Sequence, residues 1–178
     1  MIGWRAGRFA AIALTLMASI AGAAERIGAS AASQRGEHVF RLSGGCSCHM
    51  DVKKQGASLA GGRPLQTPFG VFFAPNITPD SDTGLGPWSE VDFIRAMTAG
   101  VGKHDQHLYP AFPYTSFTRM TGRDLKDPWA HLATVAPVRN TNREHDLLPR
   151  VGIRSAVRVW KAIKSLKPIV QKLEKKNR

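Results

Sequence analysis

The only two cysteines of the chain, Cys46 and Cys48, lie one residue apart, and His49 follows them directly. A disulfide between these two thiols would close a very small ring. Because the stabilisation from a disulfide grows with the length of the loop it closes, such a bond would hold almost no structure together. We therefore expect the thiols and the neighbouring imidazole to serve chemistry, and the fold to be built around them.

The Cys-Ser-Cys-His sequence is one residue shorter than Cys-x-x-Cys-His, the motif that attaches haem c. In that motif both sulfurs bond to one edge of the porphyrin, and the histidine becomes an axial iron ligand. Here Gly45 occupies the position of the first cysteine. Either Cys48 forms the only thioether, which we favour, or Gly44 and Gly45 let the backbone distort so that Cys46 bonds as well. A degenerate site without haem and a minimal metal site are further interpretations.

The first residues of the chain have the pattern of an export signal. Arg5 and Arg8 precede an apolar stretch over residues 9–20, and small residues follow up to Ala23. Such a stretch has the length of a signal-peptide core and is short for a membrane span. We predict a signal peptide over residues 1–23, with an uncleaved membrane anchor as the alternative. Export would place the protein in the periplasm, soluble or peripheral to the membrane, and disfavours nucleic acid as a partner.

Helix signals in the rest of the chain are separated by loops rich in proline and glycine. Ser89 is predicted to cap one helix, which runs to about Ala99, and Thr121 with Asp124 resembles a capping box for another, which runs to about Thr134. A further helix is predicted over residues 34–42. The apolar residues at helical spacing are Val91, Ile94, Met97, Leu125, Trp129 and Leu132. The long segments 53–86 and 103–119 are predicted loops, and no strand is expected, so the pattern predicts an all-α fold.

The net charge of +12 is concentrated at the C-terminus. From Arg154 onward there are nine Lys or Arg residues and one Glu, a local net charge of +8. We assign residues 151–178 to a basic amphipathic tail, whose apolar stripe includes Val157, Trp160 and Ile163. Such a helix either lies on an anionic membrane surface or packs its stripe on the protein body or on a partner subunit. Both alternatives remain open.

Six further stretches, taken in order, carry a resemblance to a known family. They are Gly61–Pro64, Thr67–Gly70, Pro75–Asp80, Gly84–Ser89, Asp92–Met97 and His107–Thr121. Together with the Cys-His pair they resemble the cytochrome c domains of membrane-bound periplasmic dehydrogenases, among them the cytochrome subunits of alcohol and gluconate dehydrogenases. The resemblance covers about residues 35–140 and corresponds to a single haem module. It implies an all-α cytochrome c domain, residues 24–150, with long loops around one covalently bound haem.

The resemblance also implies roles for individual residues. Cys48 matches a haem cysteine and His49 the proximal iron ligand, while Met120 matches the distal methionine. Arg63 lies where an arginine commonly approaches a haem propionate. Cys46 has no match in register, which leaves the second thioether in doubt.

The position of Met120 in the chain also favours it as the second ligand. A thioether ligand must come from a loop that folds over the open haem face, ahead of the next helix. Met50 is too close to the proximal histidine to reach that face, and Met97 is expected to pack in the core. His104 and His107 could bind a metal or replace Met120, but two histidines without further ligands more often lie on a surface.

These assignments predict an electron carrier and not an enzyme. With histidine and methionine both bound, the two axial positions are closed and the haem potential is raised, which suits electron transfer. The predicted path runs from a periplasmic or membrane-bound dehydrogenase to an acceptor in the respiratory chain, and the tail would add peripheral membrane contact. The rival predictions are a haem-free docking protein that keeps the cytochrome fold, and a haem enzyme or sensor whose iron site is open because Met120 does not bind.

Overall fold

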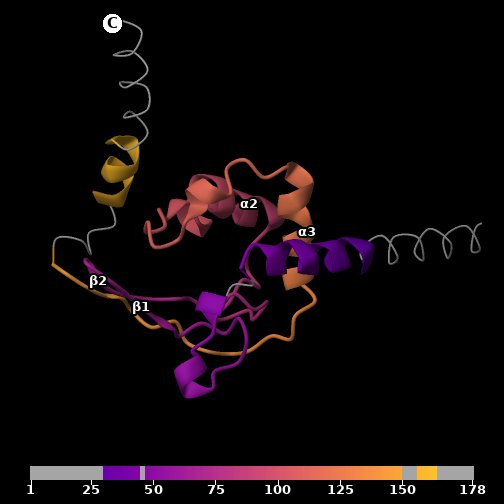
Figure 1. Cartoon of the computed structure of the whole chain (residues 1–178), viewed down its shortest axis with the longest axis horizontal. Coiled ribbons are helices and arrows are strands. Elements are labelled where there is room, and N and C mark those ends of the chain that lie inside the picture. The colour runs from indigo at the N-terminus through magenta and orange to yellow at the C-terminus, as the bar shows by residue number, and fades with distance from the viewer. Residues whose placement is uncertain (1–29, 45–46, 150–155, 164–178) are drawn as a thin grey trace, which may run out of the picture.

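The computed structural model describes residues 30–44, 47–149 and 156–163. A helix over residues 30–42 crosses α3 (Gly122–Leu132), and α2 (Glu90–Ala99) packs near them, as Figure 1 shows. A small sheet lies on the other side of the molecule. The predicted signal peptide, residues 1–23, lies outside the described residues.

Part of the segment predicted to be a loop forms an antiparallel sheet. The strand β1 (Pro64–Thr67) pairs with β2 (Gly70–Phe73), and β3 (Asp146–Leu147) pairs with the other edge of β2. The prediction of an all-α fold without strands is therefore wrong. Strands of four and two residues are too short to show a clear alternation of apolar and polar residues. In addition, β3 comes from a part of the chain far from its partner.

The predicted starts of α2 and α3 and the predicted end of α2 are confirmed by their capping bonds. The Ser89 hydroxyl accepts a hydrogen bond from the Asp92 N–H, and the Asp92 carboxylate reaches back to the Ser89 N–H at 3.0 Å. Gly100 ends α2 in the left-handed conformation that glycine favours, with φ of 60°. The Thr121 hydroxyl caps α3 by accepting from the Asp124 N–H at 3.2 Å. That helix ends at Leu132, two residues before the predicted Thr134.

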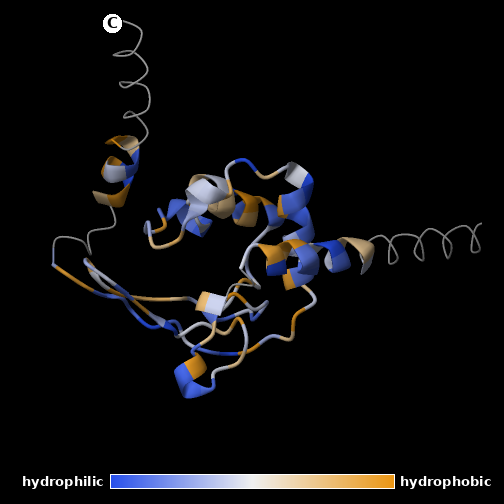
Figure 2. Cartoon of the chain, in the orientation of Figure 1, coloured by the Kyte–Doolittle hydropathy of each residue, from blue (hydrophilic) through white to orange (hydrophobic). Residues whose placement is uncertain are grey.

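The main core joins the three helices of the body. Its buried members Leu59, Phe93 and Leu132 come from a loop, from α2 and from α3. Partly buried hydrophobic residues around them are Phe40, Ile77, Leu85, Met97, Trp129 and Val135. Figure 2 shows hydrophobic and hydrophilic residues interleaved along these helices, as expected for amphipathic elements with one packed side. Val91, one of the apolar residues at helical spacing, is 72% exposed and lies outside this core.

A second apolar cluster anchors the described part of the tail. Phe72 of β2, Tyr109 and Val157 are buried together, and Leu65 and Leu147 pack against them. The start of the tail stripe thus packs on the protein body, which was one of the two alternatives for it. In the ranges that the structure covers, no helix is both long enough and apolar enough to cross a membrane.

The crossing of helix 30–42 with α3 is unusually close at Gly36. A Cβ atom on Gly36 would lie 1.8 Å from the carbonyl oxygen of Asp127. The neighbouring Arg35 binds the Asp127 carboxylate with two nitrogens, at 2.7 and 3.1 Å. Asp127 is 6% exposed, so this ion pair fixes the crossing from within the interface.

We expect Gly36→Ala to lower the free energy of unfolding by about 2 kcal/mol or more, because the two helix backbones must separate. The clash outweighs the gain of about 1 kcal/mol that alanine has over glycine inside a helix. Gly122→Ala is the matched control, since no atom lies within 4 Å of the Cβ position there. Urea denaturation of both variants checks this, and equal stability of the two would contradict the described crossing.

Candidate functional site

The Cys48-His49 pair lies in a tight 3-10 turn, Ser47–His49, just after the N-terminal helix. Gly44, with φ of 96°, turns the chain out of the helix. Cys48 and His49 are half-buried, and the His49 carbonyl accepts a hydrogen bond from the Gly61 N–H at 2.8 Å. Cys46, the other predicted haem cysteine, lies outside the described residues.

The imidazole of His49 is oriented by a backbone carbonyl. Its Nδ1 lies 2.7 Å from the Pro75 oxygen. Because a carbonyl oxygen can only accept a hydrogen bond, Nδ1 carries the proton, and Nε2 therefore carries the lone pair. Burial lowers the pKa of His49, while the bond to Pro75 acts in the opposite direction. The neutral ring thus presents one fixed nitrogen ligand, which is the state that binds a metal.

The carbonyl that orients His49 belongs to a segment held by a buried amide. Asn76 follows Pro75 and is 2% exposed. Its side-chain N–H group donates to the Thr83 hydroxyl at 2.9 Å and to the Val138 carbonyl at 2.7 Å. Its side-chain oxygen accepts from the Thr78 N–H and hydroxyl, at 2.9 and 2.8 Å. Every polar atom of the side chain is satisfied, so the segment has a single favourable arrangement.

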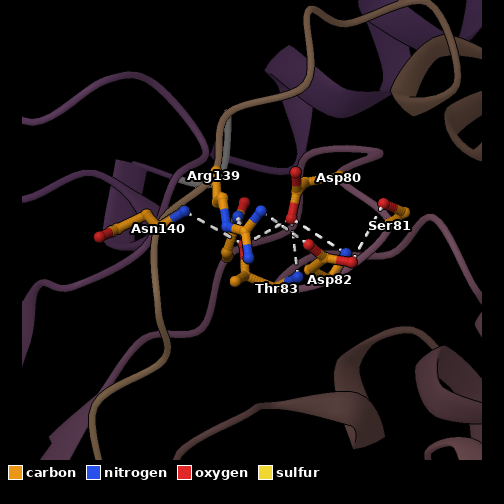
Figure 3. A network of polar contacts seen from close by, with 7 residues as sticks. Asp80, Ser81, Asp82, Thr83, Arg139 and Asn140 are labelled. Carbon is orange, nitrogen blue, oxygen red and sulfur yellow. Dashed lines mark hydrogen bonds and ion pairs between the residues drawn. The ribbon is translucent and has the colours of Figure 1, made fainter.

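A polar turn at Asp80 supports Thr83, as shown in Figure 3. The Asp80 carboxylate accepts from the Thr83 N–H and hydroxyl, both at 2.7 Å, and from the Asp82 N–H at 3.2 Å. These bonds, led by the Thr83 hydroxyl, lower the pKa of Asp80. From the opposite segment Arg139 binds Asp82 at 2.9 Å, and the Asn140 N–H donates to the Thr83 hydroxyl at 3.1 Å. The turn therefore ties residues 138–142, which we call the strap, to the loop that carries Pro75.

Two further predicted site residues occupy different places. The guanidinium of Arg63 donates to the Ser47 carbonyl at 3.0 Å, so Arg63 contacts the Cys48-His49 turn directly. Met120 is half-buried and immediately precedes the cap of α3, and its N–H donates to the Phe117 carbonyl at 3.1 Å. The structure thus brings Arg63 to the Cys48-His49 turn and leaves Met120 in its own loop, ahead of α3 as predicted.

The two histidines considered as alternative ligands lie in a strained hairpin. His104 and Asp105 have φ of 58° and 57°, in the left-handed region. His107 lies 3.4 Å from the Lys161 ammonium, and burial together with this and other nearby cations lowers its pKa. Among the residues described, no three His, Cys, Asp or Glu side chains gather in a group that could hold a metal ion.

Lys161 belongs to the described part of the basic tail. Its ammonium donates to the Ala99 and Gly100 carbonyls at the end of α2, at 2.7 and 2.6 Å. A cation at a helix C-terminus satisfies carbonyls that lack partners within the helix. It also lies 4.5 Å from the centre of the Tyr114 ring. This contact, with the buried Val157, docks the described tail helix, residues 156–163, on the body.

Sequence reasoning missed the residues that orient His49. These are Pro75, Asn76, Thr83 and the asparagines of the strap. Pro75 and Asn76 belong to a stretch that carried the family resemblance, which was the available signal. The strap gave none, because it forms no regular element and its partners lie about 60 residues away in the chain.

Comparisons with known proteins give relatives among cytochrome c subunits of dehydrogenases. No family model matches the chain. The chain is 37% identical over 131 residues to the gluconate 2-dehydrogenase cytochrome c subunit of Pantoea cypripedii, which covers 73% of the chain and 29% of that subunit. It is 36% identical over 139 residues to a diheme cytochrome c-type protein of Cereibacter sphaeroides, which covers 76% of the chain and 47% of that protein.

A third relative is the cytochrome c subunit of the quinone alcohol dehydrogenase of Gluconobacter oxydans. It is 34% identical over 174 residues, 96% of this chain and 35% of that subunit. The chain therefore spans less than half the length of each of these relatives. The similarity confirms the predicted relationship to the cytochrome c subunits of dehydrogenases.

The lowered pKa of Asp80 predicts a pH dependence of stability. Because its folded-state pKa lies below the ordinary 3.8, the stabilisation from Asp80 is present above that value. It is lost as the pH falls through the folded-state pKa. We therefore expect Asp80→Asn to be less stable than the parent at neutral pH and the difference to shrink below about pH 4. Urea denaturation across this range checks it, and a difference that grows in acid would contradict the described bonds.

Proposed function

We propose, from the relationship to the cytochrome c subunits of dehydrogenases, that this chain is a haem-binding carrier of single electrons. The observation that carries the proposal is the 2.7 Å bond between His49 Nδ1 and the Pro75 oxygen. It fixes the ring with the proton on Nδ1 and leaves Nε2 as the ligand nitrogen, directly beside a cysteine that can form a thioether. A hydrogen bond from the second ring nitrogen is what metal-binding histidines typically make.

The residues present fit one haem c. His49 would bind the iron on one side, and the sulfur of Met120 would bind it on the other. Cys48 would attach the porphyrin covalently. A bound haem c would supply an iron that gains and loses one electron. Arg63, whose guanidinium binds the Ser47 carbonyl of the same turn, offers a cation for a haem propionate.

The partner and location follow from the same relationship. The related proteins are named as subunits of gluconate and alcohol dehydrogenases. We infer a dehydrogenase as the electron donor, a respiratory-chain component as the acceptor, and export to the periplasm through the predicted signal peptide. In the described tail helix Trp160 and Ile163 are 41% and 54% exposed, so this side of the helix supports contact with a membrane or a subunit.

Covalent attachment is tested with the full-length chain expressed together with a cytochrome maturation system. We expect the purified protein to stain for haem after denaturation, and its intact mass to show one haem and the loss of about 23 residues at the N-terminus. Cys48→Ala should lose the stain, whereas the matched Cys46→Ala should keep it if the single thioether is at Cys48. Colourless parent protein with no added mass would overturn the proposal and favour the haem-free docking protein.

The second iron ligand is tested with Met120→Ala. Sulfur bound to oxidised haem iron gives a weak long-wavelength absorption band, and we expect this band to disappear in the variant because the thioether is gone. Met97→Leu is the matched control, since Met97 packs against the main core and should leave the band unchanged. A band that survives in Met120→Ala would show that another residue binds the iron.

A further inference from the structure

The peptide unit between Pro75 and Asn76 is hydrogen-bonded at both ends. Its carbonyl oxygen accepts from His49 Nδ1 at 2.7 Å, and its N–H donates to the side-chain oxygen of Asn142 at 2.7 Å. Three groups from distant parts of the chain therefore form one line: the Asn142 amide, the peptide unit and the imidazole. The second bond comes from the strap, which has no regular secondary structure.

The orientation of the Asn142 amide is fixed by its two partners. Its oxygen faces an N–H donor, and its nitrogen donates to the Thr83 carbonyl at 2.9 Å. Exchanging the oxygen and nitrogen would place a donor against a donor and an acceptor against an acceptor, so only one orientation satisfies both. In this orientation Asn142 presents an acceptor to the Asn76 N–H.

Close packing holds the Pro75–Asn76 peptide unit in place between the Asn142 amide and the His49 ring. Gly61 packs so closely beneath it that a Cβ atom there would lie 2.5 Å from the Pro75 carbonyl carbon and 2.6 Å from the Asn76 nitrogen. The buried Asn76 side chain fixes the same unit from the other end. The geometry is therefore set by directional bonds and close backbone contact.

A peptide unit transmits polarisation because its C–N bond is conjugated with its carbonyl. An acceptor at the N–H shifts electron density toward the carbonyl oxygen, and hydrogen bonds in such a chain strengthen one another. A more negative oxygen strengthens the bond from His49 Nδ1 and raises the basicity of Nε2. A more basic ligand favours the oxidised state of a bound iron, because that state carries the higher charge.

We propose that Asn142 is a positioning residue for His49, which acts through the Pro75–Asn76 peptide to orient the ring and lower the reduction potential of the bound haem. This rests on the proposed function, since it needs haem on His49. It assigns a role in tuning the metal to a residue 93 positions beyond the ligand. Neither sequence pattern nor regular structure marks this residue.

The test compares acceptor strength at position 142 in haem-loaded full-length protein. Asn142→Ala removes the acceptor, and we expect a several-fold rise in the ratio of reduced to oxidised protein at a fixed solution potential. The proton resonance of His49 Nδ1–H in the reduced protein should shift upfield as its bond weakens. Asn142→Asp keeps an acceptor of the same shape and strengthens it, so both observables should move in the opposite direction.

Asn140 supplies the matched controls. It lies in the same strap, and its side chain donates to the Ala60 carbonyl at 2.7 Å and not to the Pro75–Asn76 peptide. Asn140→Ala should leave the His49 resonance in place, and Asn140→Asp reports what a nearby negative charge does on its own. Asn142→Asp should exceed that effect.

The outcomes separate the two proposals. Parent protein without haem would overturn the proposed function and this inference with it. Haem-loaded protein whose potential and His49 resonance are the same in both Asn142 variants would overturn the inference alone, as would Asn140 variants that reproduce the shifts. If Asn142→Ala does not fold, Asn142→Asp still decides, because loss of the Thr83 bond by itself would not shift the resonance downfield.

Discussion

The hydrogen bond from His49 to the Pro75 carbonyl is the contact on which the other features of the site depend. It joins the turn Ser47–His49 to the loop that follows β2, and it decides which imidazole nitrogen carries the lone pair. Around it, the Gly61 N–H binds the His49 carbonyl, and the Gly62 N–H binds the Ala74 carbonyl, both at 2.8 Å. Backbone hydrogen bonds next to His49 therefore also join the two loops.

Local chemistry could be predicted from the sequence, and long-range pairing could not. The caps at Ser89 and Thr121 and the helix end at Gly100 each depend on neighbours within four residues. The residue types at these positions are therefore enough to predict them. The Cys48-His49 pair was equally visible, because its chemistry depends on spacing. The strands β1 and β2 were missed because four residues are too few to show a clear alternation, and β3 because its partner β2 lies far away in the chain.

The difference between local and long-range interactions also explains why the sequence did not predict the exposure of Val91 or the contacts of Lys161. Val91 has the helical spacing of a core residue, but Phe93 and Ala96 are the buried residues of α2, and only the position of α3 decides which face is covered. Lys161 looked like one of several solvated charges. Its partners are the last carbonyls of α2, and a helix end that lacks partners attracts a cation from whichever segment the fold brings near.

In the loops around Pro75 and the strap, side-chain amides hold the backbone in place, as hydrogen bonds within helices and sheets do elsewhere. Thr78 is completely buried and Asn76 nearly so, yet each polar atom of their side chains has a partner in the loop or the strap. An apolar core accepts several packings of similar energy, whereas a buried amide left unpaired costs about 1–3 kcal/mol. The polar network therefore selects one arrangement of the loops. That network ends on the peptide that binds His49. Directional hydrogen bonds therefore fix the orientation of the His49 ring, without long helices or strands around it.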